Sequence, residues 1–330
     1  DIMLYNIAKR KLSQIDHCNW KMHPELKRFS VDWSADSKWL TYARGMDNQN
    51  GAIFLYNIEK DKLSQVNSSY YDDSDPAFDP AGKYLYFLTD RHFSPEYSDM
   101  DNSFIYPNST KLVAVSLRKN VDSPLAPKND SVSVEVQDPE KTDDKEKDKK
   151  EEKQEQKEKQ LEIVLDNFEE RMIVLPPDHG NYSFVSAVEG KVLYMEYPLT
   201  GSRDKTKTLK YFDLEEEEEK EIISGISGYE LSAGNNKILI AKNGSFGVID
   251  VAPGQKFEDV ISTDGLQMEL DPLAEWNQIY NDAWRIVRDY FYDPNMHGVD
   301  WNGIKAKYGK LLNEAVTRSD VNYLIGEMIA

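Results

Sequence analysis

Alternating apolar and polar positions dominate residues 1–260, in short runs joined by a recurring turn phrase. In each copy an apolar run enters a tight polar turn, a lysine follows, and a second alternating run begins. Alternation with a period of two is typical of β-strands that bury one face. The copies lie at residues 31–42, 77–87, 185–194 and 231–240.

The lysines of this phrase are about 45 residues apart, except across one gap that a charged segment lengthens. They are Lys38, Lys83, Lys191 and Lys237. A period of that size, with room for four strands in each unit, is typical of β-propeller blades. One blade cannot bury both of its faces, so several blades must stack around a shared axis.

Hairpin patterns between the turn phrases complete the blades. Residues 53–66 form one alternating hairpin, and residues 3–15 open the chain with a near copy of it. Later counterparts lie at residues 111–117, 209–214 and 246–251. We therefore predict a mostly β fold, a partial propeller of about four and a half blades, and we expect earlier blades to precede the first residue.

A strongly charged run interrupts this pattern. From Asp138 to Gln160 the chain is almost only Lys, Glu, Asp and Gln. Such a run buries nothing that could offset the entropy cost of ordering it. We expect residues 127–160 to be a disordered charged insertion inside a blade, because strand-like sequence resumes at Leu161–Leu165 and Met172–Leu175. A docking tail is the less favoured interpretation.

Near residue 270 the apolar period changes from two to about 3.6. Asp271 and Pro272 form a helix start, with an N-cap carboxylate and a first-turn proline. That helix should end at Asp293, and two more should begin after Asp300 and near Ser319. The residues expected to face inward are Trp276, Ile279, Tyr280, Ala283, Trp284, Val287, Tyr290, Phe291, Trp301, Ile304, Tyr308, Leu311, Leu312, Val321, Leu324, Ile325 and Met328.

The predicted organisation is a propeller portion over residues 1–265 and a small three-helix domain over residues 266–330. Three short helices make a thin core when they stand alone. We therefore expect the helical domain to dock on another domain.

Charge and cysteine content narrow the classes of partner. The net charge is −19, with 59 acidic and 40 basic side chains, which disfavours nucleic acid and membrane surfaces as partners. The single cysteine, Cys18, excludes an internal disulfide and a cysteine-based metal site. We attribute the triplet Asn67-Ser68-Ser69 to chance rather than glycosylation. No segment has the length and apolarity of a membrane span, and no signal peptide begins the chain.

No convincing active-site motif occurs. Residues 225–229 come nearest to a serine-hydrolase elbow but lack its final glycine. Phosphate-binding and dinucleotide-binding glycine patterns are absent, as is a zinc-binding H-E-x-x-H motif. We therefore assign no catalytic, cofactor-binding or metal-binding residue and expect no cofactor. The histidines are scattered, mostly in predicted loops: His17, His23, His92, His179 and His297.

Two local features have both a purely structural and a functional interpretation. Asp72, Asp73 and Asp75 could hold calcium, but their spacing is irregular, and a solvated loop at a blade edge is favoured. His297 lies between two predicted helices, where capping or packing is favoured over a pocket contact.

A distinctive aromatic series runs through the helical segment. It comprises Glu275-Trp276, Ala283-Trp284-Arg285, Tyr290–Asp293, His297–Trp301, Tyr308, Leu311-Leu312 and Arg318–Ile329. This series resembles the first core domain of tricorn-type proteases, which are tail-type serine peptidases. Residues 79–88 and 171–182 resemble the second propeller of the same family, so the resemblance spans nearly the whole chain.

The resemblance implies a serine peptidase in which two propellers precede a helical domain, a PDZ-like domain and a peptidase core. The propellers of that family are thought to filter and channel peptides. Its Ser-His pair follows the third helix of the helical domain, and its nucleophilic serine and oxyanion hole come later. Residues 266–330 would then begin the protease core. Because the chain stops at Ala330, we expect no peptide cleavage by this chain alone.

The implied partners are peptide substrates, the PDZ-like and peptidase core domains, and further copies in a homo-oligomer. The implied location is cytoplasmic, while a periplasmic or secreted location stays open. Two rival interpretations remain: a TolB-like propeller that binds proteins without an attached peptidase, and a prolyl-oligopeptidase-type enzyme. The three aromatic helices argue against the second rival, and the residues after Ala330 would test the first.

Overall fold

The computed structural model describes residues 1–18, 29–98, 100, 102–127 and 161–330. The chain divides into two compact units, residues 1–261 and residues 262–330. The expected charged insertion lies outside the described residues, apart from Pro127.

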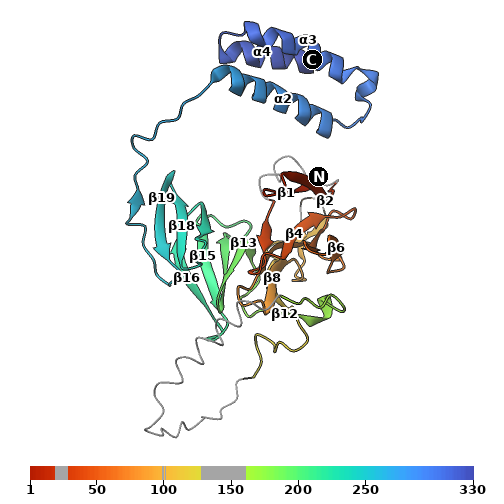
Figure 1. Cartoon of the computed structure of the whole chain (residues 1–330). Helices are drawn as coiled ribbons and strands as arrows, with labels where there is room; N and C mark the ends of the chain where they lie inside the picture. The colour runs from red at the N-terminus through yellow and green to blue at the C-terminus, as the bar shows by residue number, and fades with distance from the viewer. Residues whose placement is uncertain (19–28, 99, 101, 128–160) are drawn as a thin grey trace. The chain divides into compact units, whose positions relative to one another are not determined.

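The first unit contains blades of four antiparallel strands each (Figure 1). Blade 1 comprises β3 (Val31–Trp33), β4 (Trp39–Gly45), β5 (Gly51–Asn57) and β6 (Lys62–Gln65). Blade 2 comprises β7 (Asp73–Phe78), β8 (Tyr84–Thr89), β11 (Lys111–Ser116) and β12 (Met172–Val174). A hairpin of β9 (Glu96–Ser98) and β10 (Ser103–Ile105) lies between β8 and β11 in the chain.

Two more blades follow. Blade 3 comprises β13 (Asn181–Val188), β14 (Lys191–Tyr197), β15 (Thr208–Asp213) and β16 (Glu218–Ser224). Blade 4 comprises β17 (Gly228–Leu231), β18 (Lys237–Lys242), β19 (Ser245–Asp250) and β20 (Val260–Ile261). The pair β1 (Ile2–Asn6) and β2 (Lys11–Asp16) forms a half blade before them. The predicted partial propeller of about four and a half blades is therefore confirmed.

The recurring turn phrase joins the first two strands of a blade. In blade 2, the buried carboxylate of Asp79 accepts hydrogen bonds from the backbone N–H of Ala81 (3.2 Å) and Lys83 (3.0 Å). Gly82 has a φ of +66°, a left-handed conformation that suits glycine. The same turn opens at Ser34 in blade 1 and at Ser232 in blade 4, where Trp39 and Lys237 donate backbone N–H groups to the serine hydroxyls.

The central strands of blades 1 to 3 send their alternate side chains into two different cores. On β8, Leu85 and Phe87 pack into a cluster shared with blade 1. Tyr86 and Leu88, on the opposite face, pack into a cluster shared with blade 3. In these strands, the alternation seen in the sequence therefore separates the residues that pack on the preceding blade from those that pack on the following blade.

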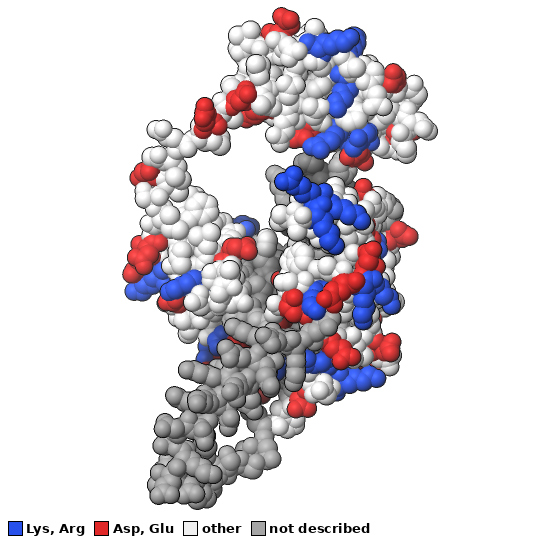
Figure 2. Space-filling view, in the orientation of Figure 1, with Lys and Arg blue, Asp and Glu red and all other residues white. Residues whose placement is uncertain are grey.

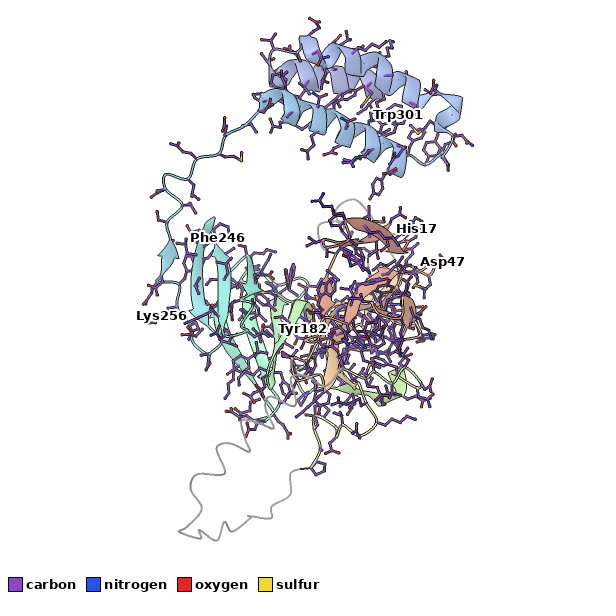
Figure 3. All side chains as sticks on the ribbon, viewed as in Figure 1. His17, Asp47, Tyr182, Phe246, Lys256 and Trp301 are labelled. Atoms are coloured by element: carbon purple, nitrogen blue, oxygen red, sulfur yellow. The ribbon has the colours of Figure 1, made fainter. Side chains whose placement is uncertain are left out.

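Within this unit, blade 4 buries only the face that packs on blade 3. Ile238 and Ile240 are fully buried on that face. On the opposite face, Leu239, Phe246 and Val248 are each about 40% exposed, and Phe246 is labelled on β19 in Figure 3. Such a row of exposed apolar side chains is typical of a surface that packs against another structural element.

The structure corrects the prediction of a strand at Leu161–Leu165. This segment is irregular, although Leu161 and Ile163 are buried between blades 1 and 2. The Leu161 N–H donates to the Asp36 carboxylate at 2.7 Å, and the Leu161 carbonyl accepts from the Trp39 indole at 3.2 Å. Side chains thus satisfy the backbone of Leu161. Blade 2 closes through β11 and β12, which flank the charged run in sequence, so the run does interrupt a blade.

The second unit consists of α2 (Pro272–Tyr290), η3 (Met296–Gly298), α3 (Trp301–Gly309), η4 (Lys310–Glu314) and α4 (Arg318–Ile329). The Asp271 carboxylate caps α2 by accepting from the N–H of Leu273 and Ala274. The third helix begins at Arg318, next to the predicted start near Ser319, and Thr317 and Asp320 form a reciprocal capping box there. Among the described residues, no helix has the length and apolarity to cross a membrane.

The core of the second unit is built around a pair of tryptophans. The Trp284 indole donates to the Trp301 carbonyl at 3.0 Å, and the Trp301 indole donates to the Trp284 carbonyl at 3.2 Å. Tyr290, Phe291 and Leu311, which were expected to face inward, are exposed. The first two lie at the C-terminal end of α2. Leu311 lies in the η4 turn, whose tighter winding of about three residues per turn changes the direction of side chains.

Replacing Asp79 tests the turn that defines the blade repeat. Asp79→Ala leaves the N–H groups of Ala81 and Lys83 without their acceptor, so we expect a loss of about 1.5–3 kcal/mol in the free energy of unfolding. Urea denaturation followed by circular dichroism measures it. Glu189→Ala, in the exposed turn of blade 3, is the matched control. Equal free energies of unfolding for the two variants would show that the hydrogen bonds of Asp79 do not stabilise the blade.

Candidate functional site

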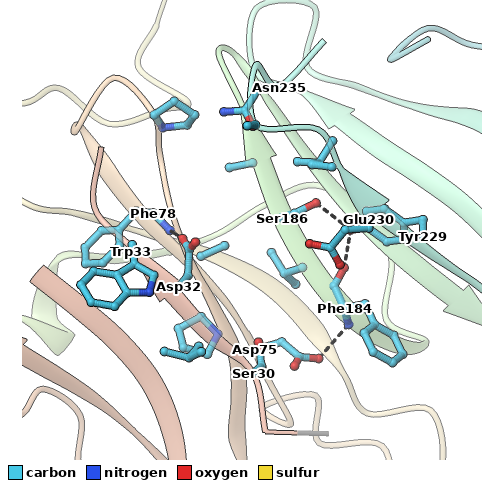
Figure 4. A pocket seen from close by; sticks show the side chains of 18 of the residues that line it. Ser30, Asp32, Trp33, Asp75, Phe78, Phe184, Ser186, Tyr229, Glu230 and Asn235 are labelled. Atoms are coloured by element: carbon cyan, nitrogen blue, oxygen red, sulfur yellow. Dashed lines mark hydrogen bonds between the residues drawn. The ribbon is translucent and has the colours of Figure 1, made fainter. Parts of the chain in front are cut away.

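The first strands of the four blades, β3, β7, β13 and β17, surround a cavity of about 560 Å³ (Figure 4). These are the innermost strands, so the cavity lies along the propeller axis. Its size falls within the range of about 300–1,000 Å³ that is usual for ligand sites.

The walls of this axial cavity are acidic and aromatic. Asp32, Asp75 and Glu230 contribute carboxylates, and no Lys, Arg or His is among the described lining residues. Figure 4 shows Asp32 on one wall and Glu230 on the facing wall. Trp33 and Phe184 also line the cavity, with 45% and 44% of their surfaces exposed. By contrast, Figure 2 shows acidic and basic side chains interspersed over the outer surface in that view.

Asp32 joins blade 1 to blade 2. Its carboxylate accepts the N–H of Phe78 at 2.7 Å. Burial raises the pKa of Asp32, and the N–H groups of Phe78 and Trp33 oppose that shift. A raised pKa means that the folded chain holds this proton more tightly than the unfolded chain. The contribution of Asp32 to stability therefore falls as the pH rises from 3.8 through the folded pKa.

Phe184 is held between blades 2 and 4. Its N–H donates to the Asp75 carboxylate at 2.8 Å, and its carbonyl accepts the Tyr229 hydroxyl at 2.5 Å. Tyr229 also bonds the Ser186 hydroxyl at 2.7 Å, and burial raises the pKa of Tyr229. Phe184 has a φ of +58° at a bulge in β13, a strained conformation for an aromatic residue. Side chains of both neighbouring blades thus stabilise the backbone that presents this ring to the cavity.

The acidic turn at Asp72, Asp73 and Asp75 is not the solvated loop that the sequence led us to expect. Asp73, the first residue of β7, is fully buried and bonds Asn67 and Arg91. The three carboxylates take different partners: Asp72 accepts from the Gly51 N–H, and Asp75 from Phe184.

Of the described histidines, only His92 and His179 contact each other. His17 contacts Asp1, His92 stacks on His179 with ring centroids 3.6 Å apart, and His297 bonds the Tyr292 hydroxyl. His23 lies outside the described residues. Among the residues that the structure describes, no three His, Cys, Asp or Glu side chains are grouped to hold a metal ion.

The segment that came nearest to a serine-hydrolase elbow, residues 225–229, leads into β17. There the Ser227 hydroxyl donates to the Ala241 carbonyl at 2.9 Å. Its hydrogen bond is therefore internal to blade 4.

The sequence analysis named none of the residues that line the axial cavity, although a signal for some of them exists. Asp32 and Glu230 each lie two residues before the serine that opens the turn phrase, Ser34 and Ser232. Aligning the repeats places both carboxylates at one position of the innermost strand. The bulge at Phe184 has no comparable signal, because its acceptor, Asp75, and its donor, Tyr229, are remote from it in sequence.

Comparisons with known proteins cover both units. Residues 1–252 match the tricorn protease second beta propeller domain, and residues 272–330 match the tricorn protease C1 domain. A tricorn protease homolog of Streptomyces coelicolor is 27% identical over 90% of this chain and 28% of its own length. A tricorn protease homolog of Saccharolobus solfataricus is 24% identical over 99% of this chain and 29% of its own length.

Comparison with solved structures agrees with these sequence matches. A crystal structure of the tricorn protease matches 99% of this chain and 30% of its own length, with a TM-score of 0.75 and 20% identity. The chain thus spans about a third of the length of the curated relatives that it matches.

Removing the Tyr229 hydroxyl tests the connection across blades 3 and 4. Tyr229→Phe deletes the donor to the Phe184 carbonyl, so we expect a loss of about 1 kcal/mol in unfolding free energy. We also expect faster hydrogen exchange at the Phe184 N–H, since the bulge loses one of its two restraints. Tyr70→Phe, at a largely exposed tyrosine, is the control. Unchanged exchange at Phe184 would contradict this role of Tyr229.

Proposed function

This chain belongs to the tricorn protease family, and from that premise we propose that its propeller unit passes extended peptides along the axis toward a serine peptidase core. The observation that carries the proposal is the axial cavity between β3, β7, β13 and β17. An extended chain can enter a space lined by inner propeller strands, whereas a folded domain is too wide for it. The propeller would therefore act as a filter.

The catalytic step belongs to other parts of the protein in this proposal. The axial cavity contains acidic and aromatic side chains, and its described lining holds no histidine that could act as the base for a serine. A nucleophilic serine and its histidine base would come from a peptidase core. Residues 1–265 would admit peptides, and residues 266–330 would begin that core.

The helical unit would dock the propeller on the core. It leaves large apolar side chains exposed, among them Leu273, Leu311 and Tyr323. So much apolar surface on a three-helix unit fits burial against a neighbour. We propose the PDZ-like and peptidase core domains as those neighbours, in a homo-oligomeric protein of the cytoplasm.

Further blades would cover the open faces of the propeller unit. Leu239, Phe246 and Val248 on blade 4 alternate as the buried faces of other blades do. Met3 and Tyr5 on β1 are likewise exposed. Such faces are stabilised when another blade packs on them.

Narrowing the axial cavity tests peptide passage. Ala35→Trp and Ala233→Trp place a large ring at exposed positions that line the cavity. In the full-length protein, we expect each to slow hydrolysis of a ten-residue peptide severalfold, because the peptide must pass the ring. A tripeptide reporter should lose less activity. Turnover is measured by chromatography of the products.

The matched control is Ala8→Trp, which puts the same ring on an exposed turn away from the cavity. This control should cleave both substrates at the wild-type rate. Peptide turnover by Ala35→Trp and Ala233→Trp at the wild-type rate would refute passage through this cavity.

Disrupting the tryptophan pair tests docking. Trp301→Ala removes the ring and its bond to the Trp284 carbonyl, so we expect a loss of about 3 kcal/mol from the helical unit. In the full-length protein, peptidase activity should fall while peptide binding to the propeller unit persists. Asn302→Ala, at the exposed neighbouring position, should change neither quantity. Intact peptidase activity in Trp301→Ala would count against docking by this unit.

A further inference from the structure

We propose that the axial cavity recognises lysine and arginine side chains of an extended peptide, through carboxylates and aromatic rings on its walls. This inference rests on the proposed passage of peptides through the propeller, and it adds the class of peptide that the passage prefers. The site consists of Asp32, Glu230, Trp33 and Phe184, which come from three different blades.

The first support is uncompensated charge inside a cavity. Glu230 is exposed to the cavity, and Asp32, on the facing wall, uses one oxygen to accept the Phe78 N–H. No Lys, Arg or His is among the described lining residues. Carboxylates in a concave, partly dehydrated site attract cations more strongly than carboxylates on an open surface do.

Acidic groups in blade 3 outside its innermost strand take basic partners from their own blade. Glu196 and Glu219 both bond Lys210, at 2.8 and 2.7 Å, and Asp213 bonds Lys191 at 3.1 Å. Lysines of blade 3 thus form ion pairs with the carboxylates on its outer strands. The described lining of the axial cavity contains no lysine or arginine, so a cationic group of a ligand could pair with the carboxylates there.

The second support is aromatic. Trp33 and Phe184 line the cavity, and nearly half of the surface of each is exposed. The face of an aromatic ring attracts an ammonium or guanidinium group, and the aliphatic stem of Lys or Arg packs on the same ring. A wall that combines rings with carboxylates therefore suits long cationic side chains better than small metal ions. Acidic side chains would be repelled.

The occupant is an extended peptide rather than a free cation. The cavity is lined by inner strands of all four blades and has a volume of about 560 Å³, more space than one side chain fills. A peptide that moves along the axis would meet Glu230 and Asp32 on facing walls. Basic residues would then be favoured by both walls.

Matched peptides test the inference on the full-length protein. Three acetylated and amidated nine-residue peptides of Gly and Ala carry three Lys, three Gln or three Glu at the same positions. Fluorescence anisotropy gives Kd for each peptide at low and high salt. We expect the Lys peptide to bind about fivefold or more tightly than the Gln peptide at low salt, and the Glu peptide to bind most weakly.

Two neutral substitutions locate the effect. Glu230→Gln and Asp32→Asn together should abolish the preference for the Lys peptide while leaving Kd for the Gln peptide unchanged. The amide oxygen introduced by Asp32→Asn can still accept the Phe78 N–H, and Glu230 is exposed, so folding should persist; circular dichroism checks it. Glu189→Gln, an exposed acid outside the cavity, removes one negative charge and should keep the preference. A preference lost equally in this control would assign it to net charge and overturn the inference.

The remaining outcomes separate this inference from the proposed function. Equal binding of the Lys and Gln peptides, with both weakened by Ala35→Trp, would overturn cation recognition and leave peptide passage standing. Binding that Ala35→Trp does not affect, or no binding of any of the peptides, would overturn both.

Discussion

The burial of each blade between two neighbours is the constraint on which the propeller unit depends. A four-stranded sheet has two faces, and here alternate residues of one strand, such as Phe87 and Leu88 on β8, enter different cores. No blade in the middle of the series forms a hydrophobic core from its own residues alone. Stability is therefore shared between adjacent blades, as in other repeat architectures. The same rule explains why the outer face of blade 4 is as apolar as a buried one.

Side-chain hydrogen bonds connect the blades at the axis, where their innermost strands do not pair with each other. The Asp32 carboxylate satisfies an N–H of blade 2, Asp75 satisfies one of blade 3, and Tyr229 reaches from blade 4 to the Phe184 carbonyl. These bonds place carboxylates and rings around a common space. The residues that stabilise the ring of blades thus also determine the chemistry of the cavity.

The helical unit is stabilised on a different principle. Two tryptophans on α2 and α3 exchange indole hydrogen bonds with each other's carbonyl oxygens, which fixes the crossing of the two helices. Capping residues, such as Asp271 and Thr317, then determine where the helices begin. A unit of this size retains exposed apolar side chains because three short helices cannot cover all of them.

The sequence by itself determined the blade repeat, the half blade at the start and the three helices. Period, turn residues and caps such as Asp79 and Asp271 act within a few residues of each other, so they can be read along the chain. Only the tertiary structure decided that Leu161 fills a gap between blades without forming a strand, that Asp73 is buried, and that Phe184 adopts a positive φ. In each case the deciding contacts lie outside the local pattern, as Asp75 is remote in sequence from Phe184, and only folding brings such partners together.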